Sequence, residues 1–175
     1  FRGKDITKLP PNEISNLGLF MAFQYPIEIP GVTIMNFLKT IHETNRTVII
    51  CSRDHGKSVF MHAWAVWNLV FQEPPYQMLY ISSNQKQTMV HMREIDRMFN
   101  IPQLKKFRPS RGWAIGNITL TNGNSILERS VGSQIRGLHP QEIIIDDPLK
   151  EFSLVGIQRV TDWFFGDMIP TLHHT

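Results

Sequence analysis

Three short apolar runs stand out along the chain, and each is followed by a polar turn. They are residues 48–50 (VII), 76–82 (YQMLYIS) and 142–145 (EIII). Short runs of this kind are typical of strands that are buried on both faces, as in a parallel sheet. Apolar residues then recur at helical spacing over residues 59–71 and 85–99. The alternation predicts an α/β fold with a central, mostly parallel β-sheet flanked by helices.

Two of the predicted helices carry an apolar surface. In the helix after the first run this surface comprises Val59, Phe60, Met61, Ala63, Val66, Trp67, Val70 and Phe71. The last helix, expected over residues 154–168, is amphipathic through Leu154, Val155, Ile157, Val160, Trp163 and Phe164.

Local signals indicate where several elements begin and end. Asn84 is expected to cap the helix over residues 85–99, and Asn122-Gly123 predicts a hairpin turn between residues 118–120 and 125–129. Prolines divide the first 45 residues into short pieces with possible helices over residues 12–23 and 33–43. Residues 23–26 (FQYP) either offer a slot for a nucleotide base or pack an N-terminal lobe against the sheet. We therefore divide the chain into that lobe, residues 1–45, and a core, residues 46–175.

Composition narrows the class of protein only modestly. The chain has 175 residues, 42% of them hydrophobic, which suits one substantial core. A net charge of +3 is too small to indicate nucleic acid by itself, and a single cysteine excludes an intramolecular disulfide framework. No apolar window is long enough for a membrane span and no cleavable signal opens the chain, so we expect a cytosolic protein.

The first strand, its loop and the following helix form a candidate phosphate site. Residues 51–58 (CSRDHGKS) match the Walker A pattern G-x-x-x-x-G-K-[ST], except that Cys51 replaces the first glycine. The loop amides would lie at a helix N-terminus, where an anion is favoured. Lys57 would reach the β and γ phosphates of ATP, and Ser58 would ligate Mg²⁺. The loop residues expected to bind the nucleotide are Ser52, Arg53, Asp54, His55, Gly56, Lys57 and Ser58.

Two carboxylates follow the isoleucine-rich strand over residues 142–145. Open α/β sheets bind ligands at the carboxyl ends of their strands, so Asp146 is expected to hold Mg²⁺ as a Walker B aspartate. Asp147 is expected to orient the attacking water, and Glu151 is a second candidate for that role.

Three cationic features admit two interpretations each. Arg53 would contact the γ-phosphate or pair with a carboxylate, and Arg136, in the loop over residues 130–140, would stabilise the transition state or form a structural pair. The basic stretch over residues 104–113 (LKKFRPSRGW) reads as a solvated loop or as a nucleic-acid contact with stacking aromatics.

Taken together, these motifs resemble the ATPase domain of the large terminase subunit, the DNA-packaging motor of tailed bacteriophages. The resemblance rests on residues 51–58, on the loop over residues 132–140, on the strand and acids over residues 142–148, and on residues 160–164 and 168–172. It implies a P-loop NTPase fold of the ASCE (RecA-like) class. It also implies a γ-phosphate contact for Arg53 and an arginine finger, Arg136, that acts on the neighbouring subunit of a ring.

The resemblance also implies a function and partners. The chain would be an ATP- and Mg²⁺-dependent motor that drives double-stranded DNA into procapsids in the host cytoplasm. Its expected partners are the portal or procapsid, the small terminase subunit and further copies of itself in a homo-oligomeric ring. The C-terminal coupling strand and the nuclease domain would be absent, so no nuclease activity is expected. The alternatives are a helicase-type translocase, a nucleotide-binding module that does not hydrolyse, and a structural DNA-binding protein.

Overall fold

The computed structural model describes residue 43 and residues 56–150 and 153–171. The chain divides into two compact units, residues 1–57 and 58–175. Apart from residues 43, 56 and 57, the described residues belong to the second unit. The strand predicted over residues 48–50, the helices predicted over residues 12–23 and 33–43 except for residue 43, and the domain boundary after residue 45 lie outside the described residues. They stay predictions.

A four-stranded sheet forms the centre of the second unit. Its order is β2 (Asn117–Thr119), β3 (Ser125–Ser130), β1 (Gln77–Ser82) and β4 (Glu142–Ile145). Strand β1 pairs in parallel with β3 and with β4, whereas β2 runs antiparallel to β3. This mixed, mostly parallel sheet confirms the predicted α/β architecture.

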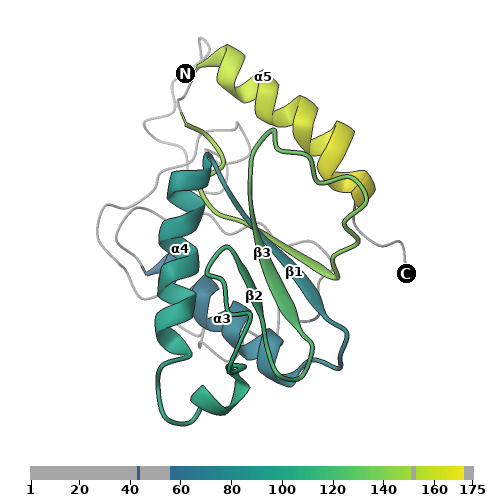
Figure 1. The fold of residues 1–175 in the computed structure, drawn as a ribbon. Helices are drawn as coiled ribbons and strands as arrows, with labels where there is room; N and C mark the ends of the chain where they lie inside the picture. Colours follow the sequence, from purple (N-terminus) through teal and green to yellow (C-terminus); the bar gives the residue numbers. More distant parts are fainter. Residues whose placement is uncertain (1–42, 44–55, 151–152, 172–175) are drawn as a thin grey trace, which may run out of the picture. The chain divides into compact units, whose positions relative to one another are not determined.

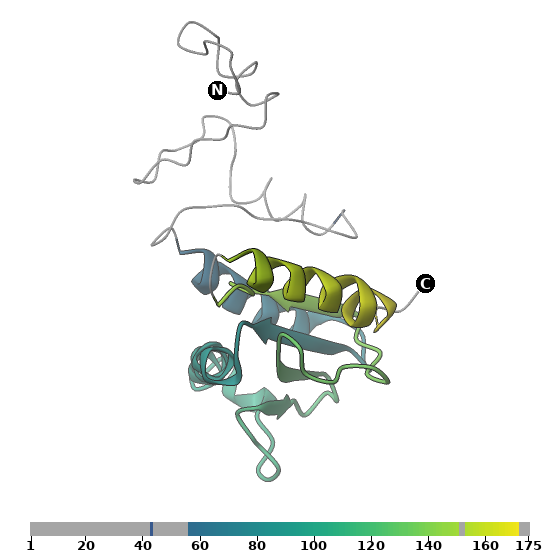
Figure 2. The ribbon, with the colours of Figure 1, turned by 90° about the horizontal axis from the view of Figure 1, so that it is seen from above.

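Helices lie on both faces of this sheet. Helix α4 (Gln85–Met98) and helix α5 (Leu154–Trp163) lie on opposite sides of the strands (Figures 1 and 2). On the α5 side, alternate β1 residues Leu79 and Ile81 join a buried cluster with Ile135, Trp163 and Met168. On the opposite side, the Tyr80 ring packs against side chains of α4 and of helix α3 (Lys57–Phe71).

The local signals read from the sequence are confirmed where the structure describes them. The side chain of Asn84 accepts a hydrogen bond from the Gln87 amide and so caps α4. Strands β2 and β3 form the predicted hairpin, with Gly123 at a φ of 93° that a residue with a side chain rarely adopts. A 3-10 turn, η1 (Lys105–Phe107), lies between α4 and this hairpin.

Helix α3 turns a different side to the sheet from the one that its apolar pattern indicates. Of the predicted apolar surface, Val59, Trp67 and Phe71 are 63%, 45% and 68% exposed among the described residues. Its buried side instead includes His62 and Asn68, which have hydrogen-bond partners. Apolar side chains surround most of this helix, so their periodicity does not reveal which side is buried.

The last helix begins where predicted but changes geometry before its end. Ser153 caps α5 by accepting a hydrogen bond from the Gly156 amide. The α-helix stops at Trp163, and a π turn, η2 (Phe164–Met168), completes the predicted segment. A 3-10 turn, η3 (Ile169–Thr171), follows it. Leu154 and Val155 are 87% and 80% exposed, so the first turn of the predicted apolar face is not covered by the described residues. In the described part of the chain, no helix combines the length and apolarity needed to cross a bilayer.

A carboxylate at the start of β4 joins α3 to the sheet. The indole Nε1 of Trp64 and the hydroxyl of Tyr76 each donate a 2.6 Å hydrogen bond to Glu142. Burial, and then the charge of Glu142, raise the pKa of Tyr76 well above its ordinary value, so the hydroxyl keeps its proton.

We expect Glu142→Ala to lower the free energy of unfolding by about 2–4 kcal/mol, because it leaves two sheltered donors without their acceptor. Urea denaturation measures the change. The matched control is the exposed Glu73→Ala, which should change stability by less than about 0.5 kcal/mol. Equal effects of the two substitutions would contradict this role for Glu142.

Candidate functional site

The N-terminus of α3 and the carboxyl end of β4 meet through one hydrogen bond. The Ser58 hydroxyl, in the first turn of α3, donates to Asp146 Oδ2 at 2.7 Å. Asp146 directly follows β4, and its amide donates to the Ile81 carbonyl of β1 at 2.9 Å, so the sheet holds its backbone. Two residues predicted to ligate one cation therefore lie in contact across 88 positions of sequence.

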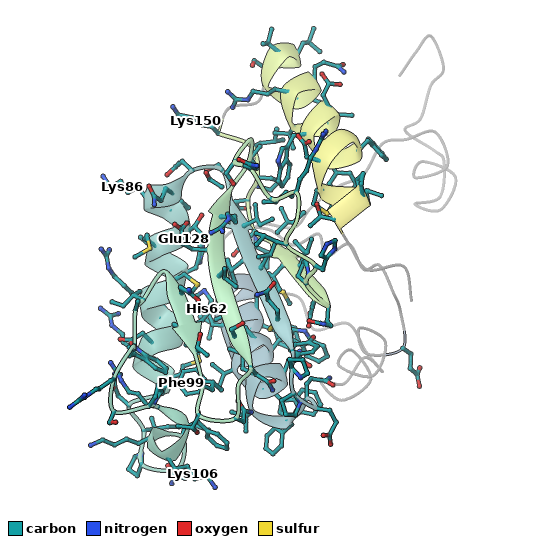
Figure 3. The ribbon with its side chains drawn as sticks, turned by 45° about the vertical axis from the view of Figure 1, so that its right-hand side comes forward. His62, Lys86, Phe99, Lys106, Glu128 and Lys150 are labelled. Atoms are coloured by element: carbon teal, nitrogen blue, oxygen red, sulfur yellow. The ribbon has the colours of Figure 1, made fainter. Side chains whose placement is uncertain are left out.

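Behind Asp146 lies a buried group of aromatic and imidazole side chains. The Tyr80 hydroxyl donates to Asp146 Oδ2 at 3.2 Å, and His91 Nε2 lies 3.8 Å from the same oxygen. The Tyr80 and His91 rings stack with centroids 5.1 Å apart. His62 Nε2 shares a 3.0 Å hydrogen bond with His91 Nδ1. All four residues are buried, and Figure 3 labels His62 within this layer.

The protonation states in this group follow from its burial. Burial first, and then the charge of Asp146, raise the pKa of Tyr80 far above its ordinary value, so this hydroxyl remains a donor. Burial, and then the neighbouring His91, lower the pKa of His62 from 6.5 to about 4. At neutral pH the His62 ring is therefore uncharged.

This shift predicts a pH-dependent stability. Below about pH 6.5 the unfolded chain binds a proton at His62 that the folded chain excludes, so stability present above that pH falls as pH drops toward 4. We expect the loss to be about 2 kcal/mol larger in the natural chain than in His62→Gln between pH 7 and 4. Urea denaturation at several pH values measures it. A pH profile of stability in His62→Gln that equals the profile of the natural chain would contradict the prediction.

The predicted phosphate loop is described only at its end. Gly56 has a φ of 71°, in the left-handed region that favours glycine, and α3 begins at the next residue, Lys57. Ser52, Arg53, Asp54 and His55 lie outside the described residues, as does Glu151. Their roles stay predictions.

Asp147, the predicted water-orienting acid, follows the buried aspartate but differs from it in environment. Asp146 is 2% exposed, whereas Asp147 is exposed and adopts a φ of 46°. Aspartate tolerates this left-handed conformation better than most residues with side chains. The turn directs consecutive carboxylates into different surroundings, one buried in the layer beneath α3 and one facing solvent.

Arg136 has structural partners in the described part of the chain. Its Nε donates to Asp167 Oδ1 at 2.7 Å, and its Nη2 donates to the Gly166 carbonyl at 3.4 Å. The guanidinium side chain is 71% exposed, while the preceding Ile135 is fully buried and anchors the loop. This is the structural pairing that the sequence left open beside a transition-state role.

Arg108 holds the basic stretch, residues 104–113, against α4. Arg108 lies 3.2 Å from Asp96 and stacks over the Trp113 ring at 4.5 Å, and Trp113 Nε1 donates to Asp96 at 2.6 Å. Lys106 lies near the end of α4 opposite Lys86, at its start (Figure 3). Asp146 lies beside the end of β1, and α4 starts just after that end. The basic stretch follows the far end of α4, so it is remote from Ser58 and Asp146.

The donor set at Ser58 and Asp146 suits a hard cation. A hydroxyl and a carboxylate are oxygen ligands of the kind Mg²⁺ prefers, and Mg²⁺ commonly takes few protein ligands beside water and phosphate oxygens. No group of three or more His, Cys, Asp or Glu side chains among the described residues is arranged to hold a metal ion by itself. The site therefore fits a cation that arrives with a phosphate ligand.

Tyr80, His91 and His62 are neighbours of the site that no sequence motif indicates. Tyr80 lies inside an apolar strand, where the sequence predicts a core residue. His62 and His91 belong to different helices, α3 and α4. Only the packing of α3 and α4 on the same face of β1 brings them together.

Comparisons with known proteins point to ATP-dependent transporters over a short stretch. No family model matches the chain. The chain is 48% identical to "Probable ATP-dependent transporter ycf16" of Antithamnion sp. over 46 residues. The matched stretch covers 26% of this chain and 18% of that protein. The chain is 55% identical over 40 residues to "Probable ATP-dependent transporter SufC" of Escherichia coli (strain K12), and this stretch covers 23% of this chain and 16% of that protein. A third relative is "ABC transporter I family member 6, chloroplastic" of Arabidopsis thaliana, 50% identical over 38 residues, or 22% and 11%.

These similarities correct the terminase prediction, which is wrong. The similarity is to ABC-type ATPases, so the viral DNA-packaging function and the host-cell setting inferred with it are withdrawn. So are the predicted partners: double-stranded DNA, the portal or procapsid, the small terminase subunit and the homo-oligomeric ring. The trans-acting role of Arg136 rested on that resemblance alone. The chain spans less than a fifth of the length of these relatives, at 18%, 16% and 11%, so the match indicates a partial similarity to ABC-type ATPases.

Proposed function

We propose that this chain carries a P-loop ATPase site that binds ATP with Mg²⁺ and hydrolyses it. The observation that carries the proposal is the 2.7 Å contact between the Ser58 hydroxyl and Asp146. It joins the first turn of α3, which begins directly after Gly56 and contains Lys57 and Ser58, to an acid at the carboxyl end of a parallel strand. These are the two parts that a P-loop ATPase brings to one magnesium ion.

The proposed roles follow from charge and position. Lys57 and the amides at the start of α3 bind phosphate, since a helix N-terminus and an ammonium group both favour an anion. Ser58 ligates Mg²⁺, and Asp146 holds the ion through its carboxylate or a bound water. Asp147, the exposed acid, orients water for attack on the γ-phosphate, and Glu151 is the alternative. Bound Mg²⁺ supplies a charge that neutralises the developing negative charge on the phosphates.

The similarity to ABC-type ATPases supports ATP as the nucleotide independently of the geometry. Relatives named as ATP-dependent transporters share about half of their residues with this chain over the matched stretch, at 48% and 55% identity. The wider setting that we propose for ATP turnover is therefore an ABC-type transporter. Its transported substrate and partner subunits lie beyond what a 46-residue similarity indicates.

Nucleotide binding and phosphate release by the purified chain test the proposal. We expect a fluorescent ATP analogue to bind more tightly with Mg²⁺ than with EDTA, and phosphate release to require Mg²⁺. Ser58→Ala should abolish most of the Mg²⁺-dependent gain in affinity. Ser125→Ala, at the start of β3 and so at the opposite edge of the sheet, should preserve it. An affinity for the analogue that does not depend on Mg²⁺, or equal losses of the Mg²⁺-dependent gain in Ser58→Ala and Ser125→Ala, would contradict the proposed site.

A further inference from the structure

We propose that Tyr80 is a positioning residue for Asp146, holding its carboxylate toward the magnesium ion when Ser58 turns its oxygen to that ion. The inference rests on the proposed function, because it names the residue that orients the Walker B acid. It concerns a hydroxyl on the buried strand β1, which the phosphate-loop and acid motifs do not include.

The geometry gives Asp146 two hydroxyl donors on one oxygen. Ser58 Oγ and Tyr80 OH both donate to Oδ2, at 2.7 and 3.2 Å. They come from different elements, because Ser58 lies at the start of α3 and Tyr80 lies in β1, and the two donors differ in what they can do next. Ser58 is half-buried at a helix terminus and is the proposed metal ligand, whereas Tyr80 is fully buried.

Metal ligation would add a second task for only one of these donors. A serine that ligates Mg²⁺ directs an oxygen lone pair at the ion while its O–H still donates to Asp146, so this one hydroxyl then has to satisfy both partners. The Tyr80 hydroxyl has no such second task, because its ring is fully buried on β1 and its hydroxyl donates to the same carboxylate oxygen. It therefore maintains the carboxylate's orientation between the free and the metal-bound state.

The layer behind Tyr80 restricts its ring. His91 stacks on it with an interplanar angle of 28°, and His62 packs against it with centroids 5.8 Å apart. The hydrogen bond between His62 and His91 ties α3 to α4 across the ring. A side chain enclosed in this way offers its hydroxyl at one place, which is what orienting a metal-binding carboxylate requires.

The experiment compares Tyr80→Phe with Tyr76→Phe. Each substitution removes one tyrosine hydroxyl that donates a hydrogen bond to a carboxylate at one end of β4. Tyr80 donates to Asp146 beside the proposed metal site, whereas Tyr76 donates to Glu142 at the opposite end of the strand. The binding readout is the affinity for Mn²⁺, as a stand-in for Mg²⁺, in the presence of a non-hydrolysable ATP analogue, followed by the electron paramagnetic resonance signal of free Mn²⁺. Turnover, the KM for ATP and unfolding by urea are measured on the same variants.

We expect Tyr80→Phe to weaken Mn²⁺ binding about 10-fold and to lower kcat by a similar factor, consistent with the 10–100-fold effects of outer-shell partners. The KM for ATP should change less than about twofold, because the phosphate contacts of the loop are untouched. Tyr76→Phe should lose stability and retain the Mn²⁺ affinity of the natural chain.

Two results would overturn the inference while leaving the ATPase site in place: unchanged Mn²⁺ affinity in Tyr80→Phe, or equal losses of affinity in both variants. If the natural chain itself shows no metal-dependent nucleotide binding, the proposed function and the inference both fall.

Discussion

Lys57→Ala should lower ATP turnover by at least about 100-fold, to the background of the assay. Lysine at this position supplies the positive charge that stabilises the transferred γ-phosphoryl group, and such charge stabilisation is worth about 3–4 kcal/mol of barrier, or roughly 10²–10³ in rate. The fold should be preserved, because Lys57 begins α3 and its side chain is not part of the buried surface. Phosphate release under saturating Mg²⁺ and ATP measures the effect.

The matched control is Lys86→Ala. Like Lys57 in α3, Lys86 lies in the first turn of a helix, here α4, which starts just after β1 ends. Figure 3 labels Lys86 at the start of α4. It follows Ser83-Asn84 and has no Gly-Lys-Ser context, so its removal should change turnover less than about twofold if only the loop lysine binds phosphate. Full activity of Lys57→Ala would remove the phosphate-site assignment.

Asp146→Asn should produce the second large loss, about 100-fold or more in turnover, together with a requirement for higher Mg²⁺. Asparagine keeps the shape and an oxygen acceptor for Ser58 and Tyr80, but it removes the negative charge that attracts the cation. Stability should not fall in parallel, because a charge that is 2% exposed is costly to bury and its neutral isostere relieves that cost. Turnover as a function of Mg²⁺ and urea denaturation separate the two effects.

Asp162→Asn provides the comparison for this variant. Asp162 is an exposed acid of α5 that accepts a hydrogen bond from Gln158 within its own helix. Its neutralisation should leave the Mg²⁺ dependence unchanged. A natural Mg²⁺ midpoint and turnover in Asp146→Asn would contradict a metal-binding role for this carboxylate.

The elements of the sheet were predictable because their signals are local. The apolar runs at β1 and β4, the Asn-Gly turn between β2 and β3, and the cap at Asn84 depend on neighbouring residues, and each is found where expected. The buried side of α3 was not predictable in this way. It depends on which side chains find partners on the sheet, and here His62 and Asn68 find them while Trp67 and Phe71 do not become buried.

The residues of the site also fall into two groups, those that a local signal identifies and those that only the packing of distant elements brings together. Ser58 was identifiable from the motif and Asp146 from its place at the carboxyl end of a strand. The structure brings them into contact where α3 begins and β4 ends. Tyr80, His91 and His62 carry no motif, because their proximity to Asp146 arises from the packing of two helices on β1. Family assignment failed for a different reason: short loops and strand-end acids recur in many P-loop ATPases, so their resemblance to terminases was not specific.

A crystal structure of the chain with Mg²⁺ and a non-hydrolysable ATP analogue tests the central claim most directly. We expect one magnesium ion about 2.1 Å from Ser58 Oγ, with the Asp146 carboxylate bound to it or to one of its waters, and with β and γ phosphates at the start of α3. A nucleotide bound elsewhere, or an ion that contacts neither Ser58 nor the shell of Asp146, would contradict it.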